Sequence, residues 1–336
     1  MGCVFSCWRD GFGRVLRAPA VAAGVYALTL LAALPLALAM RGAIEAHLGR
    51  SLAAEAVADA VNFDWWQQFM SQASGLGATF TPAIIGFAST LDGLSGLLDA
   101  QARPLPVLAA GGAYLLAWTF LAGGILDRYA RRRPTRAHGF FAAAGVFFWR
   151  FLRLGAAAGL AYWFLFAYVH GWLLDDAYTW LTRDLPVERQ AFAWRVLLYA
   201  LFGLLLVAVN VTFDYARIRL VVEDRRSALG ALKASLAFLG RRAPRVIGLY
   251  ALNALTFLVL VAAWSGAAPG AGDAGWSMWA GLLGAQVYLV ARLLLKLQFM
   301  ASQTTLFQAS LAHAGYTAAP PLAWPESAAA EMIARQ

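Results

Sequence analysis

Three polar side chains recur at every fourth position inside an apolar stretch near the C-terminal end of the chain. At this spacing Tyr288, Arg292 and Lys296 share one face of a helix. A cation inside a bilayer costs about 3 kcal/mol or more unless it is paired or hydrated, so such residues point to function. Two interpretations stay open: the cations extend to the headgroups of one leaflet, or they contact Asp214, Asp127 or a lipid phosphate. In the second interpretation Tyr288, Arg292, Lys296 and Asp214 form a candidate lipid or substrate site.

A second candidate is the aromatic pair Trp65 and Trp66, which follows Phe63 and Asp64 at a break between two amphipathic patterns. Indole rings bury a large apolar area at a membrane interface while the N–H group stays hydrated. The pair therefore predicts either an anchor in the outer leaflet or a contact with a protein partner, where Trp often dominates binding.

The remaining reactive side chains do not form a pattern typical of catalysis or metal binding. The histidines are His47, His138, His170 and His313, and they fall in separate segments. Cys3 and Cys7 are the only cysteines, and neither has a His or acidic neighbour at ligand spacing. We therefore expect no metal, no cofactor and no enzymatic activity.

The composition is that of an integral membrane protein. Of 336 residues, 61% are hydrophobic and 13% are charged, compared with about 25% charged in soluble domains. The mean hydropathy is +0.62. These values exclude a disordered chain, a secreted domain held by disulfides and an ordinary cytosolic enzyme.

The fold predicted from this composition is all-α. Six stretches reach the roughly 20 apolar residues that a bilayer core requires. The predicted spans are residues 18–40, 105–126, 154–174, 192–213, 246–264 and 276–297. The other predicted parts are an outer amphipathic segment (41–104), cytoplasmic amphipathic helices (139–153 and 228–243) and a cytoplasmic tail (315–336).

The distribution of charge predicts the orientation. Most of the 27 Lys and Arg residues fall on the side that also holds the N-terminus, while acidic residues are concentrated in the opposite segments. Because positive loops stay on the cytoplasmic side, both termini are predicted to be cytoplasmic. The net charge of +9 then faces anionic lipid headgroups, and no nucleic-acid partner is expected. A composition rich in Ala, Leu and Arg favours a bacterial cytoplasmic (inner) membrane.

A repeated unit is suggested by two short matches. The segment Tyr129-Ala130-Arg131 follows the second predicted span, and Tyr215-Ala216-Arg217 follows the fourth. The suggested unit is an amphipathic helix, a span, an outer loop and a second span.

The segment RLVVEDRRSALGALKASLAFLGRRAPRVIGLYAL combines an acidic turn at Glu223 and Asp224 with an alanine-rich helix that contains Ser235. In this pattern it resembles the multi-span membrane domain of bacterial glycerophosphodiester phosphodiesterases and related bacterial membrane-protein families. The resemblance covers roughly residues 105–300 and implies a helical membrane domain. The catalytic barrel of that family has no counterpart here, so the resemblance implies no hydrolase activity.

Two functions from different classes remain. The sparse polar content of the spans favours a non-enzymatic scaffold or assembly protein that acts through lipids, a membrane-protein partner or a second copy of itself. The alternative is a small-molecule or lipid transporter with a site near Arg292. A polar cavity between the spans would discriminate the two, because transport requires one.

Overall fold

The computed structural model describes residues 2–49, 51–59, 62–80, 94–132, 134–268 and 275–311. Throughout this part of the chain the structure contains helices and no strand. Six helices are long and apolar enough to cross a membrane, which confirms the predicted all-α class at this level. The predicted tail and residues 81–93 of the outer segment lie outside the described residues.

Each of the six helices is longer than a bilayer core requires. They are α2 (Pro19–Leu48), α6 (Leu105–Arg131), the helical rod Ala137–Thr182, α9 (Glu188–Val222), α10 (Ala228–Ala267) and α11 (Trp276–Ser310). The rod consists of α7 (Ala137–Phe164), two π-helical turns, η2 (Leu165–Val169) and η3 (Trp172–Ala177), and α8 (Tyr178–Thr182). Since about 20 helical residues span the hydrocarbon, the additional turns extend beyond it.

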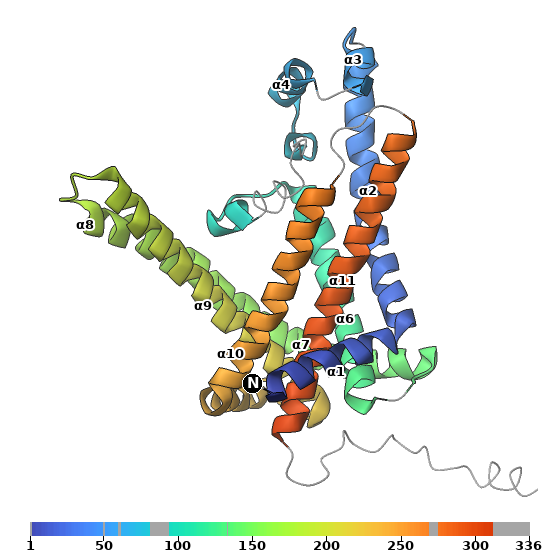
Figure 1. The fold of residues 1–336 in the computed structure, drawn as a ribbon, viewed down its shortest axis with the longest axis vertical. Helices are drawn as coiled ribbons and strands as arrows, with labels where there is room; N and C mark the ends of the chain where they lie inside the picture. The colour runs from blue at the N-terminus through green and yellow to red at the C-terminus, as the bar shows by residue number, and fades with distance from the viewer. Residues whose placement is uncertain are drawn as a thin grey trace, which may run out of the picture.

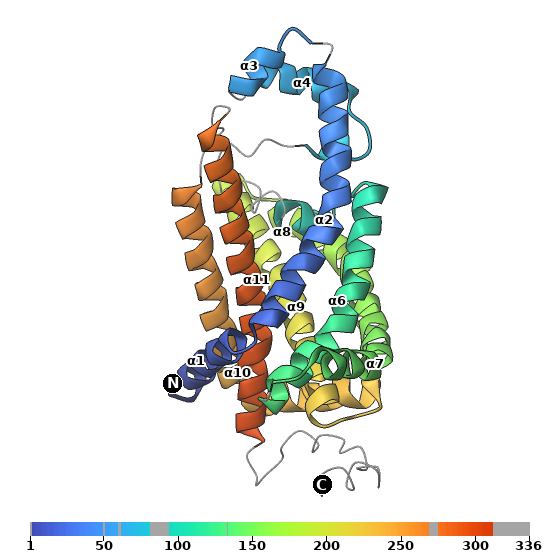
Figure 2. The same ribbon diagram turned by 90° about the vertical axis from the view of Figure 1, so that its right-hand side faces the viewer.

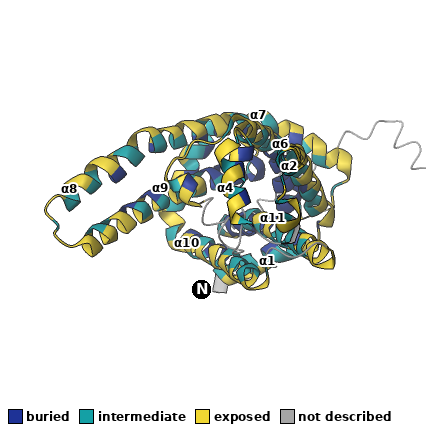
Figure 3. Cartoon of the chain, turned by 90° about the horizontal axis from the view of Figure 1, so that it is seen from above, coloured by how far each residue is buried: buried dark blue, intermediate teal, exposed yellow. Residues whose placement is uncertain are grey.

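Most of these additional turns gather at one end of the molecule, where α1 (Gly2–Leu16) lies across them, whereas those of α2 extend the opposite end (Figures 1 and 2). We call this end the platform; it comprises α1, the C-terminal ends of α6, α9 and α11, and the N-terminal parts of α7 and α10. Most of the large, fully buried side chains lie here, including Tyr129, Tyr215 and Phe307. Toward the other end the spans carry many exposed residues on their outward faces (Figure 3). Packing within the chain therefore stabilises the platform, whereas lipid must cover the spans.

The helices form three units of the kind that the sequence suggested. Each unit is a platform helix, a span leading away from the platform, an outer connection and a span leading back. The platform helix of each unit packs most extensively against the returning span of the preceding unit: α7 on α6, α10 on α9 and, closing the ring, α1 on α11. The hairpin of α8 and α9 leans away from the other spans toward its outer end (Figure 1).

Small residues allow close packing at these junctions. A Cβ atom on Gly11 would lie 2.9 Å from the backbone nitrogen of Ser302, and one on Gly124 would lie 2.8 Å from the carbonyl oxygen of Phe140. Ser235 is fully buried at the junction of α10 with α9, where its hydroxyl donates to a backbone carbonyl. Helix axes approach this closely only where no larger side chain intervenes.

The boundaries of the platform helices differ from those predicted. Residues 139–153 and the third predicted span belong to one continuous helical rod, Ala137–Thr182, because nothing in the sequence breaks α7 where the span was predicted to begin. Residues 228–243 also continue into a span, but α10 bends at Arg242 (φ −126°, ψ 17°), just ahead of Pro244. A proline inside a helix removes one hydrogen bond and bends the helix before it.

The far end of α2 carries a small cap made of α3 (Ala54–Asp59), α4 (Phe63–Gln72) and the 3₁₀ turn η1 (Gly77–Thr79) (Figure 2). The outer amphipathic segment, predicted to begin at residue 41, instead starts as part of α2, which continues to Leu48. The side chain of Asn62 accepts from the backbone N–H of Trp65 and so fixes the start of α4.

Candidate functional site: a cationic cavity between the spans

A cavity of about 790 Å³ lies between α2, α6, α9, α10 and α11, and we call it the interspan cavity. Its volume lies within the usual range of ligand sites, about 300–1,000 Å³. Its polar lining side chains are Thr29, Tyr114, Trp118, Asn210, Asp214, Arg217, Tyr250, Arg292 and Lys296. The remaining lining is apolar and includes glycine and alanine on α2 and α6.

The structure brings three of the four predicted site residues to this cavity, namely Arg292, Lys296 and Asp214. Tyr288 does not line it. Its ring stacks on Trp264 at a centroid distance of 4.7 Å. Tyr288 therefore supports the wall that carries Arg292, whose guanidinium carbon lies 5.6 Å from the centre of the tyrosine ring.

The two cations contact aromatic rings rather than carboxylates. The Nζ of Lys296 lies 3.5 Å from the ring centre of Trp118 and 3.5 Å from the hydroxyl of Tyr114. Arg292 lies 6.0 Å from the ring centre of Phe257. Among the described residues neither cation forms an ion pair. Ring faces stabilise a cation by only about 0.5–2 kcal/mol, so both charges keep most of their capacity to bind an anion.

The carboxylates predicted as partners for these cations are engaged elsewhere. Asp127 pairs with Arg131, one turn later on the same helix, at 2.7 Å. Asp214 accepts from the hydroxyl of Tyr250 at 2.9 Å and lies 3.4 Å from the nearest nitrogen of Arg217. The acid-pairing interpretation of the cations is therefore wrong for this structure, because other side chains contact the acids: Arg131 on the same helix contacts Asp127, and Tyr250 on α10 contacts Asp214.

Asp214 is the centre of a polar cluster at the platform end of the cavity. Asn210 donates to the hydroxyl of Tyr250 at 2.6 Å, and the amide of Gln303 lies 3.4 Å from the same carboxylate. The sequence gives no signal for Tyr250 or Gln303, since their partner Asp214 lies on another helix. Within the cluster Arg217 is the cation that contacts Asp214.

The charges that line the cavity therefore sum to an excess of positive charge. Three cations, Arg217, Arg292 and Lys296, face one carboxylate, and that carboxylate already contacts Arg217. In an apolar surrounding, electrostatic attraction is much stronger than in water. The cavity is thus suited to an anionic group attached to an apolar body.

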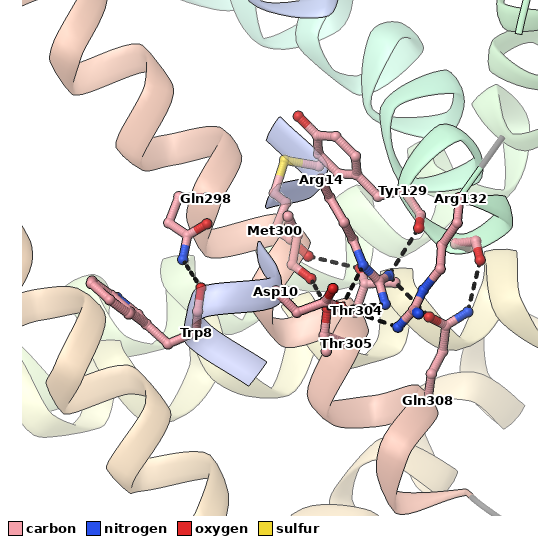
Figure 4. Close-up of polar contacts among 12 residues, drawn as sticks. Trp8, Asp10, Arg14, Tyr129, Arg132, Gln298, Met300, Thr304, Thr305 and Gln308 are labelled. Atoms are coloured by element: carbon pink, nitrogen blue, oxygen red, sulfur yellow. Dashed lines mark hydrogen bonds and ion pairs between the residues drawn. The ribbon is translucent and has the colours of Figure 1, made fainter. Parts of the chain in front are cut away.

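A second polar cluster connects α1 to the rest of the platform (Figure 4). Asp10 contacts Arg14 and Arg132 at 3.1 and 3.0 Å, and it accepts from Thr305. Arg14 also donates to the carbonyl of Tyr129 at 2.8 Å. Burial lowers the pKa of Arg14 to about 10, which leaves the guanidinium charged near neutral pH. The groups of this cluster contact one another across α1, α6 and α11, so the cluster is suited to holding α1 in place.

The structure places the tryptophan pair inside the outer cap. Trp65 is only 5% exposed, and its indole N–H donates to Nδ1 of His47 at 3.0 Å. Trp66 is half-buried and donates to the carbonyl of Phe80 at 3.1 Å. Trp65 therefore joins the cap to the end of α2, and this contact leaves its ring little area for a leaflet or a partner.

His170 and Tyr199 connect the leaning hairpin to residues 94–100. A ring nitrogen of His170 lies 2.7 Å from the carbonyl oxygen of Leu98, and Tyr199 donates to Asp99 at 2.6 Å. Hydrogen bonds from Tyr199 and Ser95 lower the pKa of Asp99. These contacts are structural, because they link an outer connection to the rod, between η2 and η3, and to α9.

Comparisons of this chain with protein-family models, with curated proteins and with solved structures find no match.

Proposed function

We propose that the protein binds an anionic amphiphile in the interspan cavity and transports it, which is the transporter alternative left open by the sequence. The observation that supports this proposal best is that Arg292 and Lys296 line the cavity without a carboxylate partner. A phosphate or carboxylate headgroup supplies the missing counter-charge. The apolar lining accommodates a hydrocarbon tail.

The same observation weighs against a scaffold that acts only through its outer surface. Two cations in the interior of a membrane protein cost free energy, and a surface scaffold gains nothing from them. The interspan cavity supports the proposal further, because transport requires a polar site between the spans and the lining of this cavity includes polar side chains. No step of this function needs a metal, a cofactor or covalent chemistry.

Two adjacent glycines on α6 provide a matched test. Gly111 lines the cavity and Gly112 does not, and a Cβ atom on either would meet no other atom within 4 Å. Gly111→Phe therefore fills the cavity, whereas Gly112→Phe adds the same side chain outside it. Both changes replace a residue that disfavours helices, so neither should impair folding.

The assay uses the full chain in vesicles of neutral phosphatidylcholine. The probes are a fluorescent fatty acid and a fluorescent phosphatidylglycerol, which distinguish a carboxylate headgroup from a phosphate headgroup. We expect binding and movement of one probe between leaflets, lost in Gly111→Phe and retained in Gly112→Phe. Equal activity of these two variants would contradict the proposal and favour the scaffold.

Arg292 provides a second test of the same site. Arg292→Ala should reduce probe binding by about tenfold or more, as expected for loss of one charge-assisted contact, while the protein stays abundant in the membrane. Arg292→Lys should be clearly impaired as well, because lysine lacks the two-pronged geometry of the guanidinium. A variant with lysine that matches the wild type would instead indicate a cation that only reaches toward headgroups.

We also propose that the platform faces the cytoplasm of a bacterium and that both termini lie there. The support is the distribution of Lys and Arg, which are concentrated in platform segments. A reporter fused after Gln336 should be active in the cytoplasm, and one inserted near Gly77 should be active outside. The opposite result at either position would overturn this orientation.

A further inference from the structure

A second depression, the platform groove, has a volume of about 430 Å³ and lies where the beginnings of α2 and α7 meet the end of α6. It shares no lining residue with the interspan cavity. Its wall contains Val21 and Gly24 from α2, Leu121 from α6, and Phe140 and Phe141 from α7. The groove therefore offers an apolar channel at the level where a span enters the membrane.

Two arginines lie at one end of this apolar wall. Arg17 is exposed, and Arg128 is 9% exposed and lines the groove. The Nη2 of Arg128 donates to the carbonyl oxygen of Arg17 at 3.0 Å. A guanidinium carries five N–H donors, so this bond leaves donors available. In the described part of the chain neither arginine forms an ion pair.

The arrangement of charge and apolar surface matches one class of ligand. Arg17 and Arg128 lie at the start of α2 and at the end of α6, where each span meets the platform. The phosphate of a lipid lies at this depth, with its acyl chains toward the membrane centre. A water-soluble anion would have no use for the wall formed by Leu121 and Phe141, and a purely apolar ligand would leave two cations unpaired.

We propose that the platform groove binds one anionic phospholipid from the leaflet next to the platform. Its phosphate contacts Arg128 and Arg17, and one acyl chain lies along Val21, Leu121 and Phe141. Arg128 also donates a hydrogen bond to the carbonyl oxygen of Arg17, which lies between α1 and α2. The bound lipid is therefore next to the turn from α1 into α2. This site is separate from the interspan cavity and does not depend on the function proposed for it.

The experiment counts bound lipids by native mass spectrometry of the full chain with added phosphatidylglycerol or phosphatidylcholine. Gly24 lines the groove, and a Cβ atom there meets nothing within 4 Å. Gly24→Leu therefore fills part of the groove without a clash. The matched control is Gly42→Leu on the same helix, which is equally unobstructed and lies outside the groove. Each measurement is repeated with Gly111→Phe, so that lipid in the interspan cavity is counted separately.

We expect Gly24→Leu to lose one tightly bound phosphatidylglycerol, with or without Gly111→Phe, and Gly42→Leu to retain it. Arg17→Gln, which keeps the carbonyl that Arg128 contacts, should weaken phosphatidylglycerol binding by about tenfold and leave phosphatidylcholine binding unchanged. Equal counts in Gly24→Leu and Gly42→Leu would overturn the site. Loss of both lipids alike in Arg17→Gln would overturn the assignment of an anionic headgroup.

Discussion

Apolar side chains have opposite surroundings in the platform and in the outer halves of the spans. In the platform, apolar side chains pack against one another, and cross-helix hydrogen bonds such as Gln298 to the carbonyl of Trp8 accompany them. In the most apolar window of each span, only 6–22% of residues are buried inside the protein. The platform therefore has the core of a soluble helical domain, whereas the outer halves depend on lipid as solvent.

This difference teaches where a polar cavity can be stable. The Asp214 cluster lies at the platform end of the interspan cavity, where neighbouring helices approach closely enough to satisfy it. Arg292 and Lys296 lie where the spans begin to separate, and there they contact aromatic side chains rather than carboxylates. A ligand site with free charges can exist at this boundary because the platform holds the helices in place beneath it.

The largest effect on this contrast is expected from Gly11→Leu. A Cβ atom at this position would lie 2.8–2.9 Å from atoms of Gln298 and Ser302, including a backbone nitrogen that cannot move aside. We expect the free energy of unfolding to fall by about 3 kcal/mol and α1 to become accessible to protease. Gly13→Leu on the same helix meets nothing within 4 Å and should be neutral. Thermal unfolding in detergent distinguishes the two, and equal stability would mean that α1 is not held against α11.

A somewhat smaller loss is expected from Arg14→Ala. The guanidinium of Arg14 bonds Asp10, the carbonyl of Tyr129 and the amide oxygen of Gln308, so its removal takes away three hydrogen bonds, one of them to a buried carbonyl. We expect the free energy of unfolding to fall by about 2 kcal/mol. The exposed neighbour Arg9 is the control, and Arg9→Ala should not change the unfolding temperature. If both variants unfold alike, the cluster in Figure 4 does not stabilise the platform.

The sequence predicts the six long helices because span length and hydropathy are local properties of the chain. It does not predict how each helix is rotated about its own axis. For that reason Arg292 and Lys296 were placed correctly on one helix, but their expected partner Asp214 contacts Tyr250 instead. The contact between Trp65 and His47 was missed for the same reason, since it depends on how the cap folds back onto α2.

A third prediction concerns the junction between α10 and α9. Ser235 is fully buried, and its hydroxyl donates to the carbonyl of Thr212 at 2.8 Å. Ser235→Ala should cost about 1 kcal/mol, the usual net contribution of one such bond. Ser265 is the control, because its hydroxyl donates within its own helix at an exposed position. If Ser265→Ala lowers the free energy of unfolding as much as Ser235→Ala does, burial at this junction adds nothing to stability.

The smallest effect on overall stability is expected at the opposite end of the molecule. Trp65 packs against Phe69 within the cap and against His47 at the far end of α2, so replacing Trp65 and Trp66 with Ala should leave the main unfolding transition unchanged. The cap itself should loosen and become sensitive to protease added from its own side of the membrane, with the number of spans unaltered. Trp180→Ala, at an exposed position near the outer end of the rod, should not have this effect.

If the double variant stays protected but loses a protein that otherwise co-purifies, the cap is a binding surface. A fall in the main transition would instead mean that cap and platform unfold together, contrary to the separation of the two regions.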